Sequence, residues 1–275
     1  GVQKWALPSL RGTDSVYIID GTFNIESSGD AIKSTNDTDT EKGFIKIDNG
    51  TFNITSSSDG IQAETKLIIN NGTFKITTNG TSSTESTKAI KSGSLTQING
   101  GTYNITSNDD GIHSNGDMYI NNGNITITSQ DDGIHADGYI EINGGTFNIS
   151  AHEGIEATYV KINDGKINIS ASDDGINAGN KSNNYSVTIE INGGYIAIKM
   201  GSGDTDGIDS NGNIYINGGT VDITGQSPFD YDGEAKYTGG TIIVNGTTTN
   251  EITNLMMGGM NGGNPNMGGN PQQRR

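Results

Sequence analysis

The sequence predicts an all-β fold, namely a right-handed parallel β-helix of about nine to ten turns with three strands in each turn. A unit of about 21 to 22 residues repeats along the chain, which is typical of a solenoid. Short runs of alternating apolar and polar residues are separated by many of the 42 glycines, whereas prolines number only 4. Because parallel crossovers strongly prefer the right hand, we expect that hand here.

Residues 1–14 lie outside the repeat and are expected to form an N-terminal arm or cap. Trp5, Leu7 and Leu10 are apolar enough to cover an open end of the solenoid, and terminal units of such folds need covering. The alternative is an arm that docks on another molecule.

The β-helix domain is predicted to span residues 15–253. Its unit is clearest in three consecutive copies, LTQINGGTYNITSNDDGIHSNGD, MYINNGNITITSQDDGIHADGY and IEINGGTFNISAHEGIEATY. Each copy has an alternating run, a turn of Asn and Gly, a second alternating run, and acidic residues before Gly-Ile. The other units follow the same plan with additions.

Isoleucine recurs in all three strands of a unit, as Ile98, Ile105 and Ile112 illustrate. Side chains two residues apart in a strand share one face, so each isoleucine belongs to an apolar face that we expect to point inward. Stacking the units then gives a core of like residues, with neighbouring turns about 4.8 Å apart.

The turn before the second strand carries Asn99, Asn121 and Asn143 in equivalent positions, each two residues before a glycine. Asn and Gly tolerate the left-handed backbone of a sharp corner, and stacked amides can hydrogen-bond from turn to turn. We interpret this column as a structural ladder.

Three sets of insertions interrupt the repeat: STNDTDTEKG, then NGTSSTEST, then NKSNNYS together with MGSGDT. Insertions in solenoids often build a binding surface on one face. Residues 254–275 are rich in Met, Gly and Asn and are expected to form a low-complexity tail, either a flexible spacer or a patch over the last turn.

The composition excludes several classes of function. The formal charge is −16, and only Arg11 among the arginines lies before the tail, which argues against nucleic-acid partners because phosphate binding needs clustered cations. The chain has no cysteine, which excludes disulfides and thiolate metal sites. No apolar run is long enough to span a membrane, and no signal peptide is seen.

Acidic residues stand before Gly-Ile in nearly every unit and are doubled in several of them. Carboxylates stacked at strand spacing repel one another, so a cation is expected among them, and an all-oxygen ligand set suits calcium. The predicted metal ligands are Asp109, Asp110, Asp131, Asp132, Asp173 and Asp174, with Glu153 between them. The alternative is that the acids only cap their own turns.

His113 and His135 occupy equivalent positions three residues after Asp110 and Asp132. Two stacked imidazoles beside carboxylates could bind a transition metal such as zinc. The same column continues as Lys91, Glu156 and Asn177, which is how an ordinary solvated face varies, so both interpretations stay open.

Outward tyrosines are the candidates for stacking on a sugar ring. Tyr119 shares an outward column with Tyr215, whereas Tyr139, Tyr159 and Tyr185 are expected at corners or insertions. The candidate carbohydrate contacts are Tyr119, Tyr139, His113 and His135.

The Asn-Gly-Gly-Thr-Phe-Asn-Ile and Asp-Asp-Gly-Ile-His-Ala units resemble those of the carbohydrate-binding, pectate-lyase-like β-helix family of clostridial-type cell-surface proteins. The resemblance covers about residues 16–244. It implies a secreted or cell-surface protein that carries calcium on its acidic face and binds a polysaccharide such as cellulose or acid sugars. The doubled acids at 109–110, 131–132 and 173–174 would inherit the calcium role.

Three hypotheses follow. The first is a non-catalytic, calcium-binding module for polysaccharide. The second is a structural protein whose rods join end to end through strand edges. The third is a calcium-dependent pectate-type lyase, for which Lys33, Lys88 or Lys91 would have to be the base because no arginine lies within the repeats.

Overall fold

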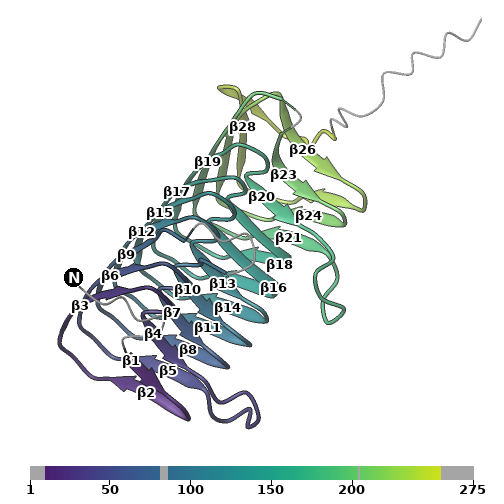
Figure 1. Cartoon of the computed structure of the whole chain (residues 1–275). Helices are drawn as coiled ribbons and strands as arrows, with labels where there is room; N and C mark the ends of the chain where they lie inside the picture. Colours follow the sequence, from purple (N-terminus) through teal and green to yellow (C-terminus); the bar gives the residue numbers. More distant parts are fainter. Residues whose placement is uncertain (1–9, 81–85, 204, 255–275) are drawn as a thin grey trace, which may run out of the picture.

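Strands stacked in sequence order make up the whole described part of the molecule, from purple at one end to yellow at the other (Figure 1). The computed structural model describes residues 10–80, 86–203 and 205–254. Trp5, Leu7 and nearly all of the predicted tail lie outside these residues. Within them the strands pair in parallel except at the last strand, which confirms the all-β, parallel solenoid arrangement.

The strands belong to two hydrogen-bonded sheets. The first sheet contains β1 (Leu10–Gly12), β2 (Ser15–Ile18), β4 (Ile32–Ser34), β5 (Phe44–Ile47), β7 (Ile61–Ala63), β8 (Lys66–Ile69), β10 (Ile90–Ser92), β11 (Leu95–Ile98), β13 (Ile112–Ser114), β14 (Asp117–Ile120), β16 (Ile134–Ile142), β18 (Ile155–Ile162), β20 (Ile176–Ala178), β21 (Thr188–Ile191), β23 (Asp206–Ser210), β24 (Asn213–Ile216), β26 (Ser227–Tyr231) and β27 (Ala235–Tyr237). The second contains β3 (Thr22–Ser27), β6 (Thr51–Ser56), β9 (Thr73–Thr78), β12 (Thr102–Ser107), β15 (Asn124–Ser129), β17 (Thr146–Ala151), β19 (Lys166–Ala171), β22 (Tyr195–Met200), β25 (Thr220–Thr224), β28 (Thr241–Val244) and β29 (Thr247–Thr249).

Two of the three expected strand columns therefore share one sheet. Only Asn115 and Gly116 separate β13 from β14. In the next two turns the corresponding strands are continuous and form the single strands β16 and β18. The chain passes this corner without leaving the sheet because so short a link lets both strands keep their parallel partners. Tyr139 and Tyr159, expected at corners, instead lie within β16 and β18.

The core is the predicted stack of like side chains. Ile98 aligns with Ile120, and Ile105 with Ile127, and all four are buried. Near the purple end, stacked rings form a further column in the second sheet, with centroid separations of 4.7 to 5.0 Å: Phe23, Phe52, Phe74 and Tyr103. Burial of whole columns at each turn is the main stabilising term, since apolar area removed from water contributes about 25 cal/mol per Å².

The asparagine ladder is confirmed. Each amide nitrogen donates to the preceding turn's oxygen at 2.7 to 3.0 Å, through Asn70, Asn99, Asn121, Asn143, Asn163, Asn192 and Asn217. Asp48 accepts at the start of the ladder and Thr238 donates at its end. The column thus satisfies its own polar groups along the axis.

The two ends differ. At the first, β1 pairs in parallel with β4, so Leu10–Gly12 already forms part of the first sheet. At the other, β29 folds back on β28 in antiparallel pairing, which covers the last edge of the second sheet. No helix in the described ranges has the length and apolar character of a membrane span.

Candidate functional site

The acidic column lies at the turn that leads into the first sheet, and its carboxylates point along the molecular axis. In four turns one oxygen of the acid accepts a hydrogen bond from the backbone N–H at the same position of the next turn. Asp110 binds the N–H of Asp132 at 3.2 Å, and Asp174 that of Asp206 at 3.1 Å. The predicted stacking of equivalent acids is therefore confirmed in these turns, where the acid caps the next turn. Capping within one turn occurs as well, since Asp109 Oδ1 accepts the backbone N–H of Asp110 at 3.0 Å.

Basic residues neutralise the first part of this column. A basic side chain three residues after the acid pairs with it, as Lys33 does with Asp30 at 2.7 Å. His113 and His135 take the same position, at 2.7 Å from Asp110 and 2.6 Å from Asp132. The expected cation among the carboxylates is thus supplied, in this half, by the chain itself.

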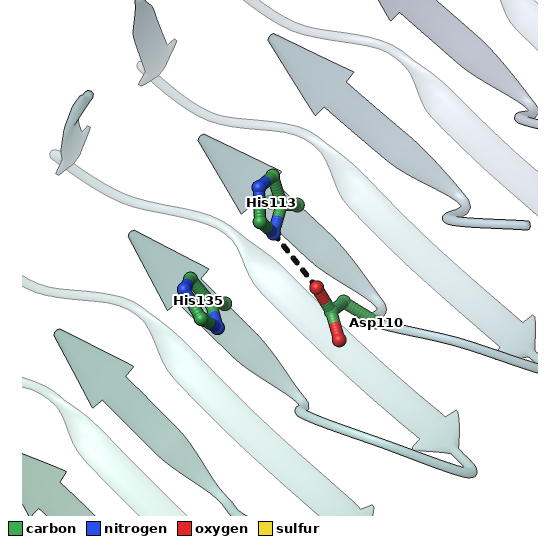
Figure 2. A group of neighbouring side chains, drawn as sticks. All are labelled: Asp110, His113 and His135. Atoms are coloured by element: carbon green, nitrogen blue, oxygen red, sulfur yellow. Dashed lines mark hydrogen bonds and ion pairs between the residues drawn. The ribbon is translucent and has the colours of Figure 1, made fainter. Parts of the chain in front are cut away.

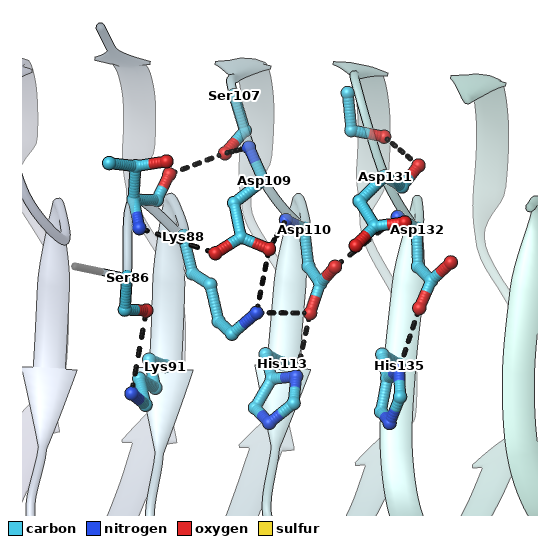
Figure 3. A network of polar contacts seen from close by, with 12 residues as sticks. Ser86, Lys88, Lys91, Ser107, Asp109, Asp110, His113, Asp131, Asp132 and His135 are labelled. Atoms are coloured by element: carbon cyan, nitrogen blue, oxygen red, sulfur yellow. Dashed lines mark hydrogen bonds and ion pairs between the residues drawn. The ribbon is translucent and has the colours of Figure 1, made fainter. Parts of the chain in front are cut away.

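Lys88 replaces an acid in the column and reaches into the next turn. Its ammonium lies 2.8 Å from Asp109 Oδ1 and 2.7 Å from Asp110 Oδ2 (Figure 3). Burial alone would lower the pKa of Lys88, but both carboxylates outweigh burial and raise it. The ammonium therefore stays charged and pairs with two of the three carboxylates, those of Asp109, Asp110 and Asp131, whose oxygens lie within 4.8 Å of one another and could otherwise hold a metal.

The two imidazoles stack on adjacent strands, with ring centroids 4.7 Å apart (Figure 2). Both nitrogens of His113 face oxygens, those of Asp110 and Asn115, and the residue is 8% exposed. Within this column His113 and Glu156 are buried, whereas Lys91, His135 and Asn177 are partly exposed, so the column is not a uniformly solvated face.

Glu156 is the site residue that sequence reasoning missed. It follows His135 in the column, and its Oε2 lies 2.9 Å from His135 Nδ1. Its other oxygen lies 2.7 Å from Lys181 Nζ, which the insertion before β21 supplies. Together these groups line a pocket of about 270 Å³: Lys88, Asp110, His113, Asp131, Asp132, His135, Glu153, Glu156 and Lys181.

The pocket shifts the pKa values of its side chains in opposite directions, upward for His135 and Glu153 and downward for Glu156. Burial would lower the pKa of His135, but hydrogen bonds with Asp132 and Glu156 raise it to about 10. Burial would raise the pKa of Glu156, but hydrogen bonds from His135 and Lys181 outweigh burial and lower this pKa to about 2. In the part of the chain that the structure describes no lysine forms an ion pair with Glu153, and burial together with the charge of Glu156 raises its pKa to about 8.

The second part of the acidic column lacks this pairing. Asn177 and Asp209 take the position that is basic in earlier turns, and in the described ranges no basic side chain pairs with Asp174 or Asp209. Burial, together with neighbouring carboxylates, raises the pKa of Asp174 to about 6 and that of Asp209 to about 7. Buried oxygens Asn177 Oδ1 and Asp230 Oδ1 have no hydrogen-bond partner. Unpaired oxygens among acids fit a hard cation such as calcium.

The predicted metal ligands thus separate into two groups. Asp109, Asp110 and Asp131 come together, and Lys88 pairs with the first two. Glu153 and Asp173 come together with His152 instead. Asp132 is engaged by His135, whereas Asp174, in the same turn as Asp173, accepts the backbone N–H of Asp206.

A second cluster lies on the outer face of the first sheet. Tyr139 contacts Tyr119, Tyr159 and Tyr185 at centroid distances of 5.8, 5.3 and 5.5 Å. Tyr185 comes from the insertion that also supplies Lys181, and its hydroxyl donates to Asp117 at 2.8 Å. All four rings are partly exposed. The equivalent positions of Tyr139 and Tyr159 in successive repeats are the sequence signal for this cluster. No such signal in the sequence indicates that Tyr185 joins it.

Comparisons with known proteins identify the family of this chain. A family described as "Carbohydrate-binding domain-containing protein" matches residues 6–133 and 126–251. Among solved structures, the chain is similar to a polysaccharide lyase-like protein from C. thermocellum, with 20% identity and a TM-score of 0.48, over 84% of this chain and 87% of that one. No curated protein matches the sequence.

Proposed function

Because this chain belongs to the family of carbohydrate-binding domain-containing proteins, we propose that it is a non-catalytic module that binds polysaccharide through its four-tyrosine cluster, formed by Tyr119, Tyr139, Tyr159 and Tyr185. The observation that carries the proposal is the contact of one tyrosine, Tyr139, with three others on an outward sheet face. Partly exposed rings with polar hydroxyls provide apolar area and hydrogen bonds, which are the two features that a sugar ring requires.

The surroundings suit an uncharged polymer such as cellulose. Glu190 accepts a hydrogen bond from the Tyr159 hydroxyl, and Asp117 accepts one from Tyr185, which holds the rings in place. Glu141 lies beside Tyr119 and Tyr139. Burial raises the pKa of both tyrosine hydroxyls, and the negative charge of Glu141 raises it further. This negative border disfavours uronates at the cluster, since like charges repel.

The test is a Tyr139→Ala variant in a binding assay on swollen cellulose and on polygalacturonate. We expect cellulose affinity to fall about tenfold, because loss of the central ring removes about 1.4 kcal/mol of stacking. Tyr195→Ala is the matched control, since Tyr195 is 40% exposed but lies on β22 of the other sheet. Equal binding by both variants would refute the cluster as the sugar site.

Calcium is part of the proposal. Glu153, Asp173 and Asp174 of the predicted ligand set, with Asn177 Oδ1, offer oxygens that form no ion pair with a lysine among the described residues, whereas Lys88 already pairs with Asp109 and Asp110. Bound there, calcium would neutralise the second part of the column and hold neighbouring turns together. It would stabilise the solenoid on which the tyrosines are mounted.

The charge of Lys88, one of the three lysines considered as the base, disfavours catalysis by this residue. A lyase base must be uncharged to accept a proton, and Lys88 is held charged between Asp109 and Asp110. We further propose that the protein acts outside the cell, secreted or attached to the surface, where plant polysaccharide is found.

A further inference from the structure

The ring nitrogen His135 Nδ1 faces two carboxylates at once. Asp132 Oδ2 lies 2.6 Å from it and Glu156 Oε2 lies 2.9 Å from it. A ring nitrogen carries at most one hydrogen, which lies in the ring plane, so a single N–H cannot be directed well at both oxygens. A cation larger than a proton would satisfy all three atoms together.

The environment of these three atoms is that of a built site. Asp132 and Glu156 are each 5% exposed. Lys181 holds the second oxygen of Glu156, and Asp137 faces the other ring nitrogen of His135 at 3.3 Å. Such outer contacts orient metal ligands and fix which ring nitrogen is free to bind. The pocket described above opens onto the group and provides a path for an ion.

We propose that His135, Asp132 and Glu156 bind a first-row transition metal ion such as zinc. Their ligand atoms lie within 4.8 Å of one another, so modest side-chain movement brings all three onto one ion. One imidazole and two carboxylates form a donor set that such ions accept, with the remaining positions left to water. This site differs from the proposed calcium ligands in containing nitrogen, and polysaccharide binding does not require it.

His113 supplies a matched control for the test. It stacks on His135 and pairs with an acid in the same way, but its Nδ1 faces the single carboxylate of Asp110. The metal-free full chain is titrated with Co²⁺, whose visible absorption reports nitrogen and oxygen coordination, and zinc then competes. Calorimetry in two buffers counts the protons released, and about one per ion is expected because Nδ1 gives up its hydrogen.

We expect one Co²⁺ per chain, displaced by zinc, with affinity lowered more than about tenfold in His135→Gln and nearly unchanged in His113→Gln. Glu156→Gln provides a second ligand variant, and thermal melting verifies that each variant is folded. Absence of a visible band in the parent protein would overturn the proposal. Equal losses in both histidine variants would also overturn it, because the ion would then lie between the imidazoles. Cellulose binding by His135→Gln should match the parent, so that failure here leaves the tyrosine cluster unaffected.

Discussion

Asp209 lies where the acidic column has lost its basic partners. It stacks on Asn177, and the carboxylates of Asp174, Asp206, Asp230 and Asp232 surround it. Burial and these charges raise its pKa to about 7, above the ordinary 3.8. Between these two values the folded chain holds a proton that the unfolded chain releases. Stability from this group is therefore greatest at low pH and is lost as the pH rises to about 7.

Substitution of Asp209 by Asn should remove this penalty. In chelator-treated protein, we expect Asp209→Asn to raise the melting temperature at pH 8 and to change it little at pH 4. Asp37→Asn removes the same charge from an exposed position and serves as the control. An equal gain at both pH values, or in both variants, would show that Asp209 is not responsible.

For single residues, the position within the repeat predicted which side chains stack, but it did not predict which of them form one charged network. The stacking of Asp110 on Asp132 and the amide ladder followed from spacing alone, because parallel strands in register place equivalent residues together. Glu156 was missed because its turn replaces a histidine by an acid, which resembles surface variation in sequence. Only the burial and the contact with His135 show that the two form one network.

The insertion of residues 179–187, between β20 and β21, connects the two sites. Its Lys181 reaches Glu156 in the acidic pocket, and its Tyr185 stacks on Tyr139. Thr158 Oγ1 accepts the backbone N–H groups of Lys181 and Ser182, which anchors the insertion to β18. A single segment therefore completes both the pocket and the tyrosine cluster.

Replacing residues 179–187 by Asn-Gly, the link used between β13 and β14, should leave the solenoid folded. We expect a small loss of melting temperature, because surface loops contribute little closure entropy, and a loss of cellulose affinity comparable to that of Tyr139→Ala. Shortening the insertion between β4 and β5 is the control, since it touches neither site. Full cellulose binding by the 179–187 variant would show that Tyr185 has no part in the sugar site.

Elements were predictable where the repeat was regular. Inward isoleucines, parallel register and the Asn corners all followed from periodicity of two within a repeating unit. The merging of two strand columns into one sheet did not follow, because β16 and β18 differ from their neighbours only in the residues at the corner. The path of an insertion is equally hidden, since it depends on contacts such as that between Tyr185 and Asp117, 68 residues apart.

For the whole molecule, removal of calcium is the informative perturbation. We expect chelator to lower the melting temperature by several degrees, because a ligand that binds only the folded chain adds stability. Asp174→Asn should abolish most of that difference, whereas His135→Gln should preserve it. Magnesium and sodium at matched ionic strength control for simple screening of the net charge of −16. Identical melting with and without calcium would remove this ion from the proposed function.

The uneven pairing of the acidic column also gives the molecule a direction. Lys33, Lys88 and His135 offset the carboxylates towards the purple end, while Asp174, Asp209 and Asp230 leave the opposite end negative. The electrostatic potential along this face is therefore graded from one terminus to the other. A linear polymer that lies parallel to the axis and carries more charge at one end than at the other would have different energies in its two orientations, so the graded face can distinguish head from tail in such a chain.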